Sequence, residues 1–173
     1  GDIRSIGNDT RRYHYGIRGG TTWKGISLAF ILHGVGKRDL WLMNELFYPH
    51  YDAYSTLFDS QLNYWTPEHT NSYFPRLYEK AEGNTKANQK PQTRFLQNGA
   101  YLSIRNISLS YTFPIKLIKP LGITNLSVFF SGENLFTFDH LPKGIDAERV
   151  VTDILGQRGF TYPYMRLFSF GIN

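Results

Sequence analysis

The chain contains no cysteine, and none of its 173 residues belongs to an apolar run near the length that a membrane helix needs, roughly 20 residues. Without cysteine, the sequence leaves the redox compartment open. A membrane-spanning β-strand needs only about 9–11 residues and barely raises a hydropathy average. A mean hydropathy of −0.36 therefore does not exclude a β-barrel. The chain starts at Gly1 with no initiator methionine or signal peptide, as expected of a fragment or a processed chain.

Motifs of enzymatic and metal chemistry are also missing. The sequence has no G-x-S-x-G, P-loop or G-x-G-x-x-G motif. Its histidines lack the spacing that puts two imidazoles on one metal: His14, His33, His50, His69 and His140. Asp146 and Glu148 could form an acid–base pair, but in a glycine-rich loop we expect them to be solvated. The sequence thus predicts a protein that is not an enzyme, with no catalytic residue, no metal site and no cofactor.

The net charge of +5 and the sequence pI near 9.4 raise the question of nucleic-acid binding. The basic residues are scattered, mostly outside the segments with strand-like patterns, and form no stripe interleaved with stacking aromatic residues. This distribution argues against nucleic acid as a partner.

Alternation of apolar and small polar residues is the strongest pattern that the sequence does contain. In the segment 106–113 the odd positions are Ile, Leu, Tyr and Phe, and the even positions are Asn, Ser, Ser and Thr. The segment 164–172 continues the pattern near the C-terminus. A period of two puts each set on its own face of a β-strand. Soluble sheets usually carry Lys, Glu and Asp on the polar face, whereas here it is Ser, Thr, Asn and Gly. We therefore expect the apolar face to meet lipid.

These patterns predict an all-β fold of five antiparallel up-and-down strands. The expected strands are about 11–18, 23–34, 99–113, 124–137 and 163–173. A tight turn is expected at Gly19-Gly20-Thr21, a bulge near Arg105-Asn106 where the phase slips, and helix only at 54–63.

The connections are alternately short and long. The short ones are 19–22 and 114–124, and the long ones are 35–98 and 138–162. In outer-membrane barrels the long loops lie outside and the short turns lie inside. Five strands cannot close a lipid-spanning barrel, because the open edges would leave amides unpaired in hydrocarbon. We expect one side of a larger barrel.

Several motifs, taken in order, resemble those of the SusC/RagA family of TonB-dependent outer-membrane receptors, and specifically the C-terminal part of the barrel. They are GVGKRD at 34–39, YWTPE at 64–68, YFPRL at 73–77, YLSIRNISLSY at 101–111, SGENLFT at 131–137, YPY at 162–164 and FSFGIN at 168–173. The resemblance covers nearly the whole chain. Members usually continue past this point to a terminal aromatic residue, so the last strand is expected to be truncated.

The resemblance implies a 22-stranded barrel with an N-terminal plug, in the outer membrane of a Gram-negative bacterium. The parent protein would import oligosaccharides or peptides under a lid formed by a SusD-like surface lipoprotein. It would contact the TonB complex through an N-terminal region that this sequence lacks.

Aromatic residues crowd the first long loop, and aromatic faces beside amides are typical of sugar binding. The residues that we expect to contact ligand or lid are Trp41, Trp65, Tyr73 and Arg76. The alternative is that such residues pack the loop against itself, because a loop of this length needs a core to be ordered. We expect packing to be the more common role.

A secreted β-sandwich that binds carbohydrate is the rival hypothesis. It predicts turn signals every 8–12 residues, whereas this chain has strands of about that length or more separated by two long connections. Solubility of the purified chain without detergent would favour the sandwich.

Overall fold

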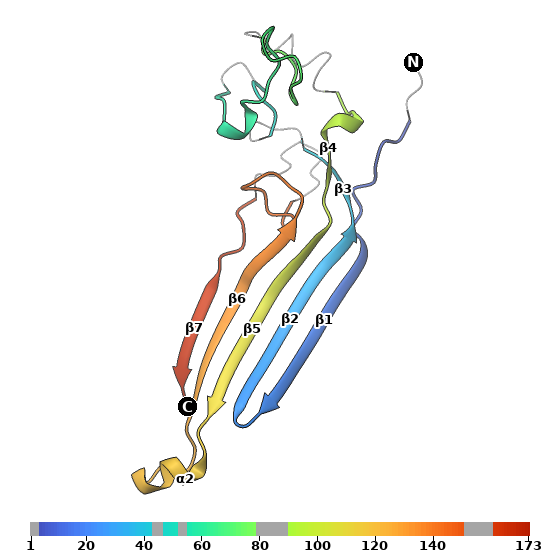
Figure 1. Cartoon of the computed structure of the whole chain (residues 1–173). Helices are drawn as coiled ribbons and strands as arrows, with labels where there is room; N and C mark the ends of the chain where they lie inside the picture. Colours follow the sequence, from blue (N-terminus) through green and yellow to red (C-terminus); the bar gives the residue numbers. More distant parts are fainter. Residues whose placement is uncertain (1–3, 43–46, 52–54, 79–89, 151–160) are drawn as a thin grey trace. The chain divides into compact units, whose positions relative to one another are not determined.

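Five long strands, joined in chain order, form one antiparallel sheet (Figure 1). They are β1 (Arg12–Trp23), β2 (Ile26–Lys37), β5 (Tyr101–Thr112), β6 (Ser127–Asp139) and β7 (Leu167–Ile172). Their order in the sheet is β1-β2-β5-β6-β7, so each connection joins nearest neighbours. The all-β, up-and-down architecture expected from the sequence is confirmed.

This computed structural model describes residues 4–42, 47–51, 55–78, 90–150 and 161–173. The chain divides into two units, each described by itself. The sheet unit comprises 11–36, 100–139 and 164–173, and the loop unit comprises 1–10, 37–99 and 140–163. Among the described residues, no helix is long and apolar enough to cross a membrane.

Strand register combines the separate alternating segments into two continuous faces. Residues paired directly across a sheet point to the same side. One row from β2 to β7 is Leu28, Leu109, Phe130 and Phe170, and the adjacent row is Ala29, Ser108, Ser131 and Ser169. A slip of one residue between any two of these strands would mix the rows. The register therefore gives the sheet one apolar face and one face on which small and polar residues predominate, with Phe129 as a large exception.

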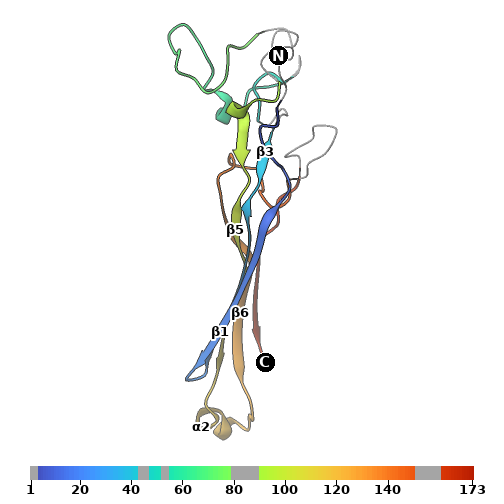
Figure 2. The same cartoon turned by 90° about the vertical axis from the view of Figure 1, so that its right-hand side faces the viewer.

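Within the sheet unit itself, no second layer covers the apolar face. Leu109, Phe130 and Phe170 are 45%, 46% and 72% exposed, and the side view shows the strands as a single twisted layer (Figure 2). The other sheet found among the described residues, β3 (Asp39–Trp41) with β4 (Leu96–Asn98), has three residues per strand. A β-sandwich needs a second sheet of comparable size. The described residues thus lack the second layer that the rival hypothesis requires.

The strand β5 is bulged where the sequence predicted a phase slip. Ile104 and Asn106 pair with both neighbouring strands, whereas Arg105 between them pairs with neither, so the predicted bulge is confirmed. The Arg105 guanidinium donates to Asn134 Oδ1 at 2.8 Å and lies 4.7 Å from the centroid of the Tyr164 ring. The bulge puts the apolar residues before and after it on the same face of the sheet.

The turn between β1 and β2 is not where the sequence predicted it. Both expected strands, 11–18 and 23–34, are present, but their expected boundaries and the turn at 19–21 are wrong, because β1 continues to Trp23 and the turn consists of Lys24 and Gly25. These two residues have φ of 47° and 87°, as a type I′ hairpin requires. Gly19 lies inside β1, and the Phe30 ring fills the space where its Cβ would be. Gly19 thus makes room for a ring from the neighbouring strand.

Other boundaries differ by a few residues. The expected segments 99–113, 124–137 and 163–173 correspond to β5, β6 and β7. The last strand begins only at Leu167 because the segment before it does not form ladder hydrogen bonds of the sheet. Asn134 Nδ2 donates to the Met165 carbonyl at 3.1 Å, and Pro163 has no N–H for a ladder.

Short helical turns occur where the sequence did not predict them. The connection 114–124 contains α2 (Ile115–Ile118) and the 3₁₀ helix η3 (Lys119–Leu121), which begin at or beside Pro114 and Pro120. Proline suits such starts because its φ is already helical. The helix considered at 54–63 is reduced to the 3₁₀ turn η1 (Asp59–Gln61), and Tyr54 lies outside the described residues.

Close packing at one glycine of β2 yields a testable expectation. A Cβ on Gly34 would lie 2.4 Å from the Tyr15 ring and 2.6 Å from the Tyr101 carbonyl oxygen, whereas Gly16 has no such atom nearer than 3.9 Å. We expect Gly34→Ala to destabilise the sheet by about 1–3 kcal/mol and Gly16→Ala to change little. The measurement is the fraction of folded protein, taken from gel mobility before and after heating. Equal folded fractions for the two variants would contradict this packing.

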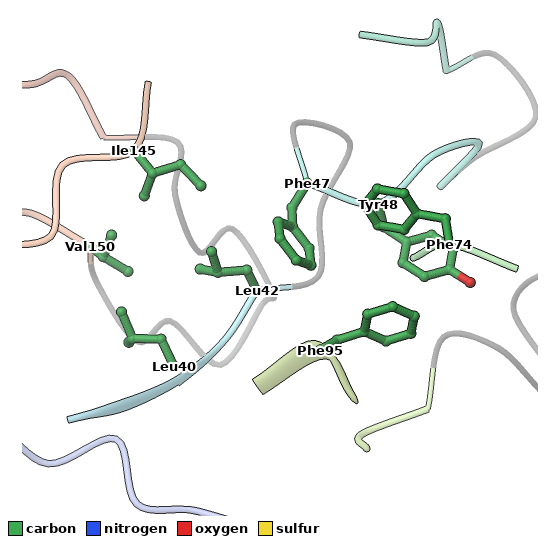
Figure 3. Close-up of a cluster of buried hydrophobic side chains, with 8 residues drawn as sticks. All are labelled: Leu40, Leu42, Phe47, Tyr48, Phe74, Phe95, Ile145 and Val150. Atoms are coloured by element: carbon green, nitrogen blue, oxygen red, sulfur yellow. The ribbon is translucent and has the colours of Figure 1, made fainter. Parts of the chain in front are cut away.

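The loop unit has an apolar core of its own. Its cluster of buried side chains comes from four separate stretches: Leu40, Leu42, Phe47, Tyr48, Phe74, Phe95, Ile145 and Val150 (Figure 3). Tyr48 meets Phe95 edge-to-face, with ring centroids 5.3 Å apart, and Phe74 at 5.9 Å. Ile145 and Val150 belong to the second long connection, so the two connections share one core.

Candidate functional site

The sequence candidates Trp65 and Arg76 lie together in the loop unit. They line one pocket of about 310 Å³. Tyr73 lines a different pocket and packs against the core. Trp41, in β3, lines a third, with residues of the N-terminal segment 5–9. The structure therefore brings together two of the four candidates.

A tight chain crossing places Trp65 beside the segment that carries Arg76. The Phe74 N–H donates to the Asn63 carbonyl at 2.9 Å, and the Trp65 N–H donates to the Phe74 carbonyl at 3.0 Å. In the loop between these two segments, Thr66 and His69 exchange backbone hydrogen bonds at 3.2 and 3.0 Å. These bonds hold Trp65 in place although the segment has no regular secondary structure.

Arg94 is the second cationic side chain that lines the pocket among the described residues, and sequence reasoning missed it. It lies in the 3₁₀ turn η2 (Thr93–Phe95). Its Nε donates to the Tyr73 carbonyl at 2.8 Å, and its Nη2 donates to the Ser72 carbonyl. The partner carbonyls lie more than 20 residues earlier in the chain, so no local pattern marks this arginine.

The pocket is lined by both positively charged and apolar side chains. Besides Trp65, Arg76 and Arg94, its described lining residues are the polar Thr70, Ser72 and Gln92 and the apolar Phe74, Pro75 and Phe95. No Asp or Glu is among these described lining residues. Such a lining favours a ligand that has both an apolar body and an anionic group.

Tyr73 is held as part of the framework behind the pocket. Its hydroxyl donates to the Arg94 carbonyl at 3.1 Å and accepts from Gln97 Nε2 at 3.0 Å. Its ring lies edge-on to Phe74 with centroids 4.8 Å apart. These contacts favour a packing role for Tyr73. Its expected contact with a ligand stays a prediction.

Tyr48 is almost completely buried in the core of the loop unit. Desolvation raises the pKa of the Tyr48 hydroxyl, although the positive charge of Arg94 acts in the opposite direction. Tyr48 therefore stays neutral in the folded loop unit. Arg94, whose positive charge acts on the Tyr48 hydroxyl, is an ionised side chain beside it.

Arg38 joins three segments of the loop unit from a buried position. It is 3% exposed. Its Nε donates to the Asp9 carbonyl at 3.0 Å, and its Nη2 donates to the Val150 carbonyl at 3.0 Å. A planar guanidinium suits such a task because it presents several donors in fixed directions. The arginine of the GVGKRD motif thus fixes the arrangement of the loop unit.

The described residues offer no arrangement for metal chemistry, since no three His, Asp or Glu side chains among them gather closely enough to hold a metal. The loop-unit pocket described above is suited to binding.

Curated relatives of the chain are TonB-dependent receptors of Formosa agariphila. The receptor P3 is 29% identical over 120 residues, which cover 65% of this chain and 11% of that protein. The receptor P26 is 21% identical over 165 residues, which cover 92% of this chain and 16% of that protein. The chain therefore spans less than a fifth of the length of these relatives. No family model matches it.

Solved structures of the RagAB peptide importer have the same fold over nearly the whole chain. The open-open state superposes with a TM-score of 0.62 at 24% identity, and the closed-closed state with a TM-score of 0.64 at 23% identity. Each superposition covers 98% of this chain and 18% of the other chain.

Proposed function

Because this chain is similar to TonB-dependent receptors and shares its fold with part of the RagAB importer chains, we propose that it forms one side of an outer-membrane importer. The sheet unit is the barrel wall, and the loop unit contributes to recognition outside the cell. The observation that carries the proposal is the exposed apolar face of the sheet unit, whose rows pair across β2, β5, β6 and β7 with one bulge at Arg105.

The ends of the sheet carry features of the membrane interface. Trp23 is exposed beside the short turn, with the Lys24 ammonium 4.8 Å from the centroid of its ring. Phe136 and Phe138 are exposed near the other end of β6, with centroids 4.6 Å apart. Aromatic residues at both ends of lipid-facing strands are typical of outer-membrane barrels.

Strand order supports an outside location for both long connections. The connections 35–98 and 138–162 start and end at the same end of the strands, and the turn Lys24–Gly25 and the connection 114–124 lie at the opposite end. In outer-membrane barrels the longer loops are extracellular. The loop unit would then face the substrate, an oligosaccharide or a peptide, and a SusD-like lipoprotein lid. TonB would act through another part of the receptor.

Accessibility to a membrane-impermeant maleimide tests this orientation in the intact receptor, with any other cysteine replaced. Lys143→Cys and Glu68→Cys, both in exposed positions of the long connections, are expected to react on whole cells. Lys116→Cys, in α2, is expected to react only after the outer membrane is permeabilised. Labelling of Lys116→Cys on whole cells, or protection of both loop positions until permeabilisation, would overturn the proposed orientation.

A further inference from the structure

The pocket between Trp65, Arg76 and Arg94 contains two positive charges that nothing beside them neutralises within the described part of the chain. Arg94 is held by carbonyl oxygens, which are neutral. The Arg76 guanidinium lies 6.0 Å from the centroid of the Tyr78 ring. Neither arginine forms an ion pair with a described carboxylate. Like charges in one small pocket cost free energy unless an anion joins them.

The two arginines are held differently, and the difference suits ligand binding. Arg94 is fixed by its hydrogen bonds to the Tyr73 and Ser72 carbonyls, and its guanidinium lies 5.9 Å from the centroid of the Tyr73 ring. Arg76 is exposed to solvent and follows Pro75, which restricts the backbone. A preorganised guanidinium beside an exposed one can orient an anionic group while the second adds a charged hydrogen bond.

The remaining lining limits what the ligand can be. Trp65, Phe74 and Phe95 offer aromatic surface, and the volume of about 310 Å³ is near the lower limit for small-molecule pockets, about 300–1,000 Å³. The pocket therefore has room for a terminal unit of a longer molecule. Planar guanidinium groups match the geometry of a carboxylate better than an ammonium does.

We propose that this pocket binds the carboxylate of the imported substrate, either the C-terminal carboxylate of a peptide or the uronic carboxylate of an acidic oligosaccharide. The proposal rests on the proposed function and narrows its substrate class. Arg94 orients the carboxylate, Arg76 adds a charged hydrogen bond to it, and Trp65 packs against the adjoining residue or sugar ring.

The test uses the purified intact receptor and two matched pairs of probes. One pair is trialanine and its C-terminal amide, and the other is trigalacturonate and its methyl ester. Binding is followed by titration calorimetry and by tryptophan fluorescence. We expect one carboxylate probe to bind at least about tenfold more tightly than its neutral partner, since each tenfold change corresponds to about 1.4 kcal/mol, close to the lower end of the range for a charged hydrogen bond.

Variants assign this preference to the pocket. Arg76→Gln is expected to weaken the preferred carboxylate probe about tenfold and to leave its neutral partner unchanged, and Arg76→Lys to restore part of the loss. Lys143→Gln removes the same charge from an exposed loop position outside the pocket and should have no effect. Equal binding of each carboxylate and its neutral partner, no binding of either carboxylate, or equal effects of Arg76→Gln and Lys143→Gln would each overturn the proposal. If maleimide labelling still places the loops outside, only the carboxylate inference fails.

Discussion

Replacing Leu109 by lysine in the intact receptor is expected to abolish most barrel assembly, whereas Ser108→Lys leaves most of it. Leu109 lies in the row of Leu28, Phe130 and Phe170 on the apolar face, and Ser108 lies in the row of small residues on the other face. A lysine facing lipid near the midplane of the membrane costs about 2–4 kcal/mol. A lysine on the interior face keeps water or polar partners.

The measurement is the yield of heat-modifiable receptor in the outer membrane, at matched expression. Phe170→Lys and Ser110→Lys form a second pair, with Phe170 in the apolar row and Ser110 on the face of Ser108. Similar yields for the lipid-side and interior-side members of both pairs would show that the exposed apolar face does not meet lipid.

Phe74→Ala is expected to unfold the loop unit and to stop uptake without preventing barrel assembly. Phe74 is buried at the centre of the core, against Phe47, Tyr48 and Phe95. Truncating a buried phenylalanine typically costs about 3–5 kcal/mol. Because the core of the loop unit is separate from the sheet, the barrel strands keep their own contacts.

Protease digestion of whole cells reports the state of the loop unit, and heat-modifiability reports the barrel. Phe58→Ala serves as the matched control, since Phe58 is 41% exposed in the same connection. Deleting Trp65 to Arg76 is a less selective experiment, because it removes Phe74 together with the pocket. Wild-type protease resistance and uptake in Phe74→Ala would show that this core does not stabilise the loops.

The alternation of side chains was enough to predict the strands, their two faces and the bulge at Arg105. These features depend on a period of two, which can be read from consecutive residues without knowing which distant residues they contact. The position of the first turn was mispredicted for the opposite reason. Gly19 lies in a strand because the Phe30 ring packs over it from the neighbouring strand.

Most contacts within the loop unit could not be predicted from the sequence. Trp65 and Arg76 were recognised as candidates from their residue types, but Arg94 was not, because its role depends on carbonyl oxygens of Ser72 and Tyr73. The pairing of β3 with β4 and the bonds from Arg38 to Val150 join segments still farther apart. By itself, the sequence determined that there are five main strands and which face of them is apolar, since both follow from local alternation. Only the tertiary structure decided which loop residues share a core and a pocket, because those contacts depend on how long connections fold back on each other.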